Sequence, residues 1–371
     1  MIMAHKEIIS ASQTYIILYL GIVSTGILTI PMPLYRYAQQ NMWVSLLLGS
    51  FIGYLMVLLI SFFRKYFPEK NMGEIIIQLL GKTLGHVSLF LILCFFAFEE
   101  IYILKEYQLY ISDVFYQFTS PFIIIGFMIL VCAYAVKNGI EVIARCAQLI
   151  LPFILFVCFG IFFLLLPDIQ FQNLFPVLEK GLIPPLKGSV LPMVWYSEFF
   201  WMTFCLGSLT ETPKKIIKSG FLCVTAITVT ILLTFIADLG ILGLYTGLTL
   251  YPISLAERYI QVGTFVERTS AFFMSIWVLG VFIKLAFLSF IIIRNSGKLL
   301  HMTEERLLIL PIFIICFWIS LRIFNSTASL FQTGNFLIVV AMSCSNIAFP
   351  ALFFLVACLR LKINKKMVLK K

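Results

Sequence analysis

Charge is scarce in this sequence, and so are the residues that usually build catalytic or metal sites. Charged residues make up 12% of the 371 residues, whereas 61% are apolar. A soluble globular domain carries about twice that share of charge, so a soluble domain is excluded. Only three histidines occur, and the nine cysteines are dispersed without any C-x-x-C pair. We therefore predict no enzyme activity, no metal site and no cofactor.

What the sequence does contain is a series of long apolar runs. A helix needs about 20 apolar residues to cross the hydrocarbon core of a bilayer. We predict an all-α integral membrane protein with a single transmembrane domain over residues 1–371. The ten predicted transmembrane helices cover residues 10–33, 42–63, 83–109, 119–136, 142–166, 189–209, 219–246, 268–293, 306–324 and 334–359.

The basic residues predict how the chain is oriented. Of the 27 Lys and Arg residues, 19 lie in connections on the side of the N-terminus, 7 lie on the opposite side, and Lys284 lies within the eighth run. Since cytoplasmic connections carry the excess of positive charge, both termini are predicted to be cytoplasmic. Topology and contact with membrane lipids account for the formal charge of +10, and no nucleic-acid partner is predicted.

Ten helices divide into two halves of five. Because each half crosses the membrane an odd number of times, the second half enters from the side opposite to the first. An inverted repeat has this arrangement, and in such folds the first helix of each half is broken near mid-membrane. The first run contains two glycines, three hydroxyl residues and a proline within residues 21–31, and the sixth contains a polar island at residues 196–198. We predict broken first and sixth helices at these places.

Unwound helices in a membrane expose backbone groups that can bind a charged solute. Free N–H groups attract a carboxylate and free carbonyls attract a cation, so the two breaks together suit a small zwitterion. The alternative is a pair of structural kinks that only allow close helix packing. The residues assigned to ligand binding are Ser24, Thr25 and Gly26 on one wall and Tyr196, Ser197 and Glu198 on the other.

Ionisable residues within apolar runs are costly to insert, so each is expected to have a partner or a function. Counting helical rise places Glu198 about 14 Å and Lys284 about 25 Å from the outer face, which disfavours an ion pair between them. Lys284 is either a coupling group that mimics a bound cation beside the first helix or a side chain that extends to the cytoplasmic interface. Glu99 and Glu100 fall in the outer half of the third run, either at the interface or in an outer vestibule.

Several segments resemble the spore germination permeases, the B-type subunits of nutrient germinant receptors in endospore-forming bacteria. The resemblance spans about residues 8–362. It rests on Gly26-Ile-Leu-Thr-Ile-Pro31, on the loop Asn173-Leu-Phe-Pro-Val-Leu-Glu-Lys-Gly181, on Glu198 and on Phe265-Val-Glu-Arg268 with Trp277. That family is similar to the amino acid–polyamine–organocation superfamily, which implies the five-plus-five inverted-repeat fold.

The resemblance implies a receptor subunit in the inner membrane of a bacterial spore or cell. It would bind a small germinant, often an amino acid, and trigger germination together with an A-type subunit and a C-type lipoprotein subunit. The alternative, from a different class of function, is an autonomous amino acid permease, with proton coupling through Glu198 as one version of it.

Overall fold

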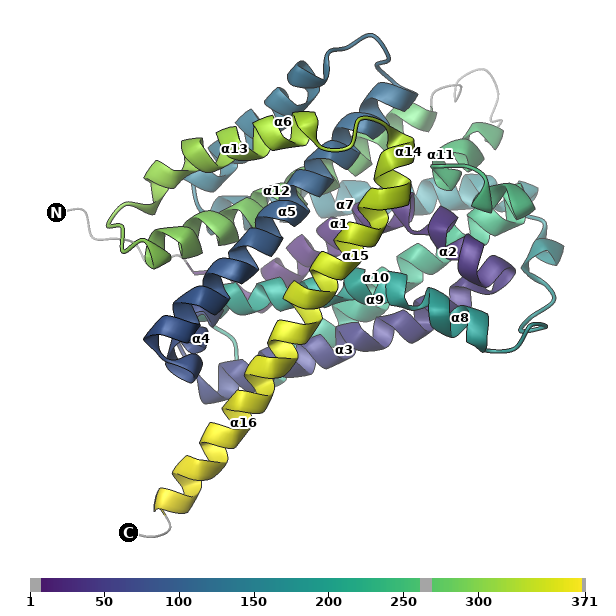
Figure 1. The fold of residues 1–371 in the computed structure, drawn as a ribbon. Coiled ribbons are helices and arrows are strands. Elements are labelled where there is room, and N and C mark those ends of the chain that lie inside the picture. The colour runs from purple at the N-terminus through teal and green to yellow at the C-terminus, as the bar shows by residue number, and fades with distance from the viewer. Residues whose placement is uncertain (1–7, 261–268, 369–371) are drawn as a thin grey trace.

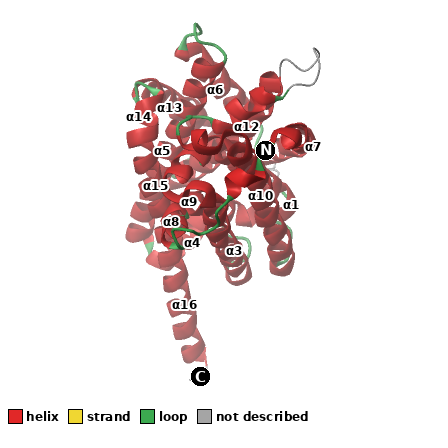
Figure 2. Ribbon diagram, turned by 90° about the vertical axis from the view of Figure 1, so that its right-hand side faces the viewer, coloured by secondary structure: helices red, strands yellow, loops and turns green. Residues whose placement is uncertain are grey.

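The computed structural model describes residues 8–260 and 269–368, and the chain is helical through nearly all of them. Within these ranges one isolated bridge, between Ile9 and Leu209, is the sole strand-type pairing. Figures 1 and 2 show a bundle of helices packed side by side, with the C-terminal helix projecting beyond the rest.

Sixteen α-helices are described: α1 (Ala11–Thr29), α2 (Pro31–Ala38), α3 (Met42–Tyr66), α4 (Met72–Leu80), α5 (Lys82–Val114), α6 (Pro121–Lys137), α7 (Ile140–Leu165), α8 (Ile183–Gly188), α9 (Val190–Ser197), α10 (Pro213–Leu242), α11 (Pro252–Ala256), α12 (Thr269–Leu299), α13 (Ile309–Arg322), α14 (Thr327–Ser329), α15 (Asn335–Ser343) and α16 (Phe349–Val368). Short 3₁₀ segments are η1 (Gln39–Asn41), η2 (Leu166–Asp168), η3 (Phe171–Leu174), η4 (Glu198–Ser208), η5 (Gly243–Gly247), η6 (Glu257–Tyr259) and η8 (Glu305–Leu308), and two π-helical segments are η9 (Leu330–Gly334) and η10 (Cys344–Ala348).

Seven of the described helical stretches are long and apolar enough to cross a membrane, and α6 is apolar but shorter. The chain is therefore a multi-pass membrane protein. Each of the ten predicted runs overlaps a described helix, whereas ten membrane crossings remain a prediction. The seven stretches are Ala11–Thr29, Pro31–Tyr66, Lys82–Val114, Ile140–Asp168, Pro213–Gly247, Ser270–Leu299 and Thr327–Lys362.

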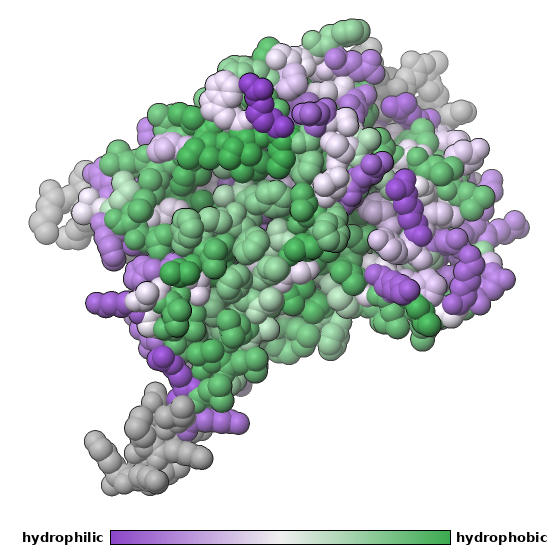
Figure 3. Space-filling view, in the orientation of Figure 1, coloured by the Kyte–Doolittle hydropathy of each residue, from purple (hydrophilic) through white to green (hydrophobic). Residues whose placement is uncertain are grey.

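The outer surface of the bundle suits a lipid environment. Large apolar side chains such as Phe127, Leu130 and Phe156 are more than half exposed. Figure 3 shows the apolar residues as a broad band across the visible face, with hydrophilic residues gathered toward the two ends of the bundle. Such a band is expected where lipid chains rather than water surround a protein.

The central helix is α1, which packs against α7, α10 and α12. Every residue from Ile17 to Thr29 is buried. Two glycines allow the close approach of α12: a Cβ at Gly280 would lie 2.5 Å from the Cβ of Ser24, and a Cβ at Gly21 would lie 3.3 Å from the Cβ of Lys284. Small residues at membrane helix contacts let backbones come this close.

The interruption of the first helix, predicted within residues 21–31, is a bend at the far end of that range. The helix α1 continues to Thr29 and bends only at Ile30, just before Pro31 begins α2. The Ser24 and Thr25 hydroxyls donate hydrogen bonds back to the carbonyl of Gly21, each at 3.2 Å. Polar side chains that bond within their own helix need no unwound backbone, so residues 21–29 stay α-helical and the interruption lies at Ile30.

The sixth run changes its helix type at the predicted island without unwinding. The α-helix α9 ends at Ser197, and the 3₁₀ helix η4 begins at Glu198. A 3₁₀ helix keeps its peptide groups bonded three residues apart, so they are not free to bind a solute. The polar island marks a real change of backbone geometry, but the predicted pair of exposed backbone sites is wrong.

Candidate binding site

A buried ion pair lies where α1, η4 and α12 meet. The ammonium Nζ of Lys284 is 2.7 Å from Oε1 of Glu198, and the two side chains are 2% and 1% exposed. The same ammonium donates a second hydrogen bond, of 2.9 Å, to the hydroxyl Oγ1 of Thr25. One lysine thus joins the first, sixth and eighth predicted membrane segments.

The hydroxyl of Thr25 is the second centre of this arrangement. Its oxygen also accepts a hydrogen bond of 3.2 Å from the indole Nε1 of Trp195 on α9. The ring of Trp201 lies on another side of the ammonium, with its centroid 5.6 Å from Nζ of Lys284. This distance is within the range of a cation–π interaction, so three kinds of contact hold the charge in place.

Two further carboxylates from α5 lie near this pair. Glu99 and Glu106 are both buried, and both interact electrostatically with Glu198 and Lys284. Neither oxygen of Glu99 makes a hydrogen bond within the described residues, although the side chain of Asn346 lies close enough to interact with it. Asn346 belongs to the π-helical segment η10, and such segments are frequent at functional sites.

The cluster therefore contains three carboxyl groups and one ammonium. Uncompensated charge is expensive in a low-dielectric interior, so the surplus carboxyl groups favour a bound proton or an additional positive charge. The arrangement can hold a cationic group or exchange protons. Among the described residues, no group of three Asp, Glu, His or Cys side chains is arranged to bind a metal ion.

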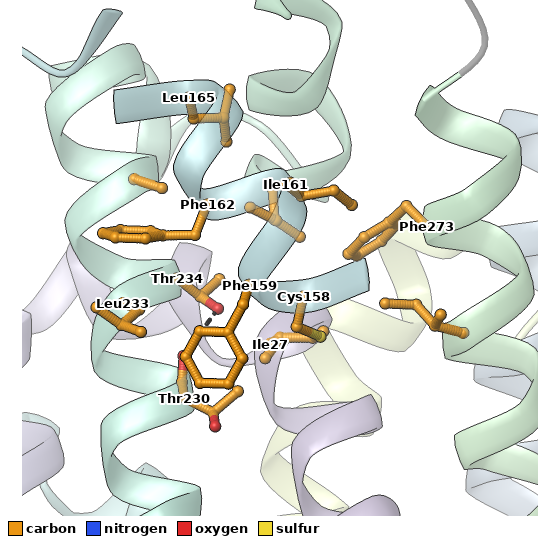
Figure 4. Close-up of a pocket in the computed structure, with 13 residues that line it drawn as sticks. Ile27, Cys158, Phe159, Ile161, Phe162, Leu165, Thr230, Leu233, Thr234 and Phe273 are labelled. Carbon is orange, nitrogen blue, oxygen red and sulfur yellow. Dashed lines mark hydrogen bonds between the residues drawn. The ribbon is translucent and has the colours of Figure 1, made fainter. Parts of the chain in front are cut away.

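The cluster is closed in this structure. None of the described cavities is lined by residues 196–198. A hollow of about 10 Å³ touches Ser24, and another of about 30 Å³ touches Ile27. Figure 4 shows this second hollow, with the ring of Phe159 beside Thr230. Volumes of this size are comparable to a single water molecule, so the predicted open pocket is absent from this packing of the described chain.

Residues 8–328 match a family whose members are described as spore germination proteins. The chain belongs to the spore germination protein family. This confirms the resemblance stated from the sequence. Part of the motif that carried it, residues 265–268, lies outside the described residues.

Relatives of this spore germination protein occur in two Bacillus species. Spore germination protein KB of Bacillus subtilis is 24% identical over 372 residues, with 97% of both chains covered. Spore germination protein YndE of the same organism is 26% identical and covers 74% of this chain and 76% of its own. Spore germination protein XB of Bacillus anthracis is 24% identical, with 79% and 82% covered.

A solved transporter structure shares the fold of the spore germination protein. It is Mhp1, a nucleobase-cation-symport-1 family transporter in a closed conformation with bromovinylhydantoin bound, and its TM-score is 0.65. The match covers 91% of this chain and 76% of Mhp1 at 12% identity, so it concerns the fold alone. The predicted class, an all-helical membrane protein of transporter type, is confirmed.

The structure brings together three of the residues that were singled out in the sequence of this chain. Thr25, Glu198 and Lys284 are in direct contact, so the argument from depth against a Glu198–Lys284 pair is wrong. It counted both segments from one common outer level along ideal helices, and it left out the length of the lysine side chain, which adds reach. Lys284 is also too deeply buried to extend to the interface.

The other predicted binding residues have partners elsewhere. The Tyr196 hydroxyl pairs with Thr228 at 2.6 Å, and the Ser197 hydroxyl donates to the carbonyl of Val194 at 2.6 Å. Gly26 packs beside Ile231, and Ser24 bonds within α1. Their place in ligand binding stays a prediction.

Glu99 and Glu100 do not line an outer vestibule in this structure. Both are enclosed by the bundle, and neither borders a described cavity. Glu100 accepts a hydrogen bond of 2.6 Å from the Ser289 hydroxyl, while Glu99 belongs to the charged cluster. Neighbours in a helix point about 100° apart, which explains why two adjacent glutamates have different surroundings.

Four residues at the cluster were not assigned to the site from the sequence. They are Trp195, Trp201, Glu106 and Asn346. Glu106 lies seven residues after Glu99, two helical turns along one face of α5, and that spacing was a usable signal. No comparable pattern in the sequence points to Asn346, because its position depends on the π-helical turn of η10.

Proposed function

We propose that this protein is a germinant receptor subunit that binds a small nutrient, an amino acid, and triggers germination. The family and the transporter-type fold support this proposal. The single observation that carries it is the bridge from Lys284 to Glu198 and Thr25, because a charged contact between three segments can report a bound charged solute.

The proposed mechanism is a shift between two packings of the bundle. A ligand that bears its own ammonium or carboxylate would compete with Lys284 or Glu198 for the partner of opposite charge. Breaking that contact would release α1 and α12 from η4 and favour a second packing. The shift is only as large as the difference in ligand affinity between the two packings.

Partner subunits are part of the proposal. An A-type subunit and a C-type lipoprotein subunit would detect the second packing and pass the signal on. The proposed location is the bacterial inner membrane with both termini in the cytoplasm, which the excess of basic residues on one side supports.

An autonomous amino acid permease is the second candidate function, and the similarity to the fold of Mhp1 favours it. A permease and a receptor use the same closed site but differ in turnover. Sealed vesicles that contain the purified protein alone separate them. A receptor subunit should bind labelled amino acids at saturable sites without accumulating them, whereas sustained accumulation inside the vesicles would establish transport.

The ligand can be sought with the same preparation. A panel of amino acids and uncharged nutrients is added to the purified protein, and its melting temperature is measured. A compound that binds only the folded form raises that temperature. Glu198→Gln should remove the response to the active compound while the variant remains folded, and an unchanged response would contradict the assignment of the site.

A further inference from the structure

An open groove runs along the bundle between α1, α7 and α10. Its volume is about 540 Å³, which makes it the largest of the described cavities. The volume falls within the range of about 300–1,000 Å³ that is usual for sites of small ligands. The groove is lined by Ser12, Tyr15, Ile16 and Tyr19 of α1, by Leu151, Leu155 and Phe159 of α7, and by residues 219, 222, 223, 225, 226, 229 and 230 of α10.

The groove opens outward and its walls are mainly apolar. Leu222 on its rim is 72% exposed. All three helices that form it belong to stretches able to cross a membrane, so the opening faces the lipid phase. Because water is not available there to fill an apolar hollow, hydrocarbon is the expected content.

Positive charge marks one end of the groove. Lys215 and Lys218 lie four residues before Ser219 and Leu222 respectively, which places them one turn further along the same face of α10. Both lysines are exposed. Nζ of Lys215 is 3.5 Å from Oε1 of Glu211, whose other oxygen accepts a hydrogen bond from the backbone N–H of Ala11. Glu211 is thus engaged with α1, and Lys218 has no ion pair within the described residues.

We propose that this groove binds one acyl chain of an anionic phospholipid, with the lipid phosphate held by Lys215 and Lys218. The lysines select the occupant, because basic sites beside membrane helices attract anionic headgroups. An uncharged lipid would leave these charges unmatched. The predicted topology places this end at the cytoplasmic surface, where anionic lipids are available.

The bound lipid would join α1 to its neighbours. Tyr15 and Tyr19, which line the groove, already bond across to α10, through the carbonyl of Ile216 at 3.1 Å and the hydroxyl of Thr230 at 2.8 Å. Phe159 and Thr230 line both the groove and the inner hollow of Figure 4, which extends to Ile27 of α1. An acyl chain in the groove therefore stabilises the helix that carries Thr25. This inference does not depend on the identity or existence of a germinant.

Lipid retention by the full-length protein tests the proposal. The detergent-purified protein is incubated with phosphatidylglycerol or with phosphatidylcholine of the same acyl chains, and bound lipid is counted by native mass spectrometry. The wild type should retain one phosphatidylglycerol in preference to phosphatidylcholine. The double variant Lys215→Gln/Lys218→Gln should retain it about thirtyfold less, since two basic contacts are removed. The control Lys65→Gln/Lys82→Gln, with the same change in charge at exposed lysines outside the groove, should behave as wild type.

A second pair of variants tests the apolar part. Leu222→Trp should fill the groove and reduce retention of both lipids, whereas Leu149→Trp, at an exposed position of α7 that does not line the groove, should not. Equal retention of the two lipids by the wild type would overturn the proposal. Unchanged lipid retention in both groove variants would also overturn it. A dimer that Leu222→Trp dissociates would do the same, because the groove would then be covered by a second copy of the chain.

Discussion

Lys284 and Glu198 form an ion pair of 2.7 Å that is enclosed by the bundle. The lysine comes from α12 and the glutamate from the first residue of η4, so the pair joins two distant parts of the chain. A buried pair of this kind contributes little net stability when it is intact, because both charges have lost their water. Its importance appears when one partner is removed.

Single replacement of either partner should therefore destabilise the protein strongly. Lys284→Met leaves the carboxylate of Glu198 without its counterion, and Glu198→Gln leaves the ammonium without its directly bonded partner, each at an expected cost of about 3–5 kcal/mol. The double variant Glu198→Gln/Lys284→Met should be closer to wild type than either single variant. Unfolding in denaturant, in a fixed detergent, measures all four proteins of this cycle. Additive effects in the double variant would show that the two groups act independently.

Glu99 gives a prediction about the surplus carboxyl groups of the cluster. Glu99 lies near the charged cluster, whereas Glu100 bonds to Ser289. Since the cluster has more carboxyl groups than ammonium groups, Glu99→Gln should leave the melting temperature unchanged at mildly acidic pH and raise it at alkaline pH, where repulsion between carboxylates grows. Glu304→Gln, which changes an exposed carboxyl group outside the cluster, is the control and should show no such alkaline gain. A loss of stability in Glu99→Gln as large as that in Glu198→Gln would contradict this account.

The sequence was sufficient for the fold class because membrane helices have a simple signature. About 20 apolar residues in a row are readily recognised, and the described helices overlap all ten runs. The polar island marked the place where the sixth run changes helix type at Glu198, although an unwound break was predicted there. The first run is interrupted at Ile30, within the predicted residues 21–31, but Ser24 and Thr25 bond within α1, because glycine content alone does not distinguish a break from close packing.

The site was harder to predict than the fold. Lys284 and Glu198 were selected because ionisable groups are rare in apolar runs, and Thr25 because it lies in the segment where a break was predicted. Their contact was missed because both depths were counted from one outer level along ideal helices, without the length of a lysine side chain. The position of Asn346 depends on the π-helical geometry of η10, a local feature that periodicity does not reveal.

Gly280 should be intolerant of even a small side chain. A Cβ at this position would lie 2.5 Å from the Cβ of Ser24 and 3.1 Å from the carbonyl oxygen of Leu20. Gly280→Ala should therefore force α12 away from α1 and lower the unfolding free energy by about 1–3 kcal/mol, as overpacking does. Gly160→Ala on α7 is the control, because a Cβ there meets no atom within 4 Å. Thermal unfolding in detergent compares the two, and equal melting temperatures would argue against tight packing of α1 on α12.

Glu257 gives a prediction about pH in a connection between membrane segments. Its carboxyl group lies in η6, and burial raises its pKa to about 7, although a hydrogen bond with Ser270 and the charge of Arg258 act in the opposite direction. A carboxyl group whose pKa is higher in the folded state stabilises the fold below its unfolded value of 4.5. That contribution is lost as the pH rises through about 7. The melting temperature of the wild type should therefore fall between these pH values, and Glu257→Gln should reduce the fall.

Glu179→Gln, at an exposed site in the loop before α8, is the control and should leave the pH profile of the melting temperature unchanged. A profile that Glu257→Gln does not alter would show that burial of this carboxyl group has no influence on stability.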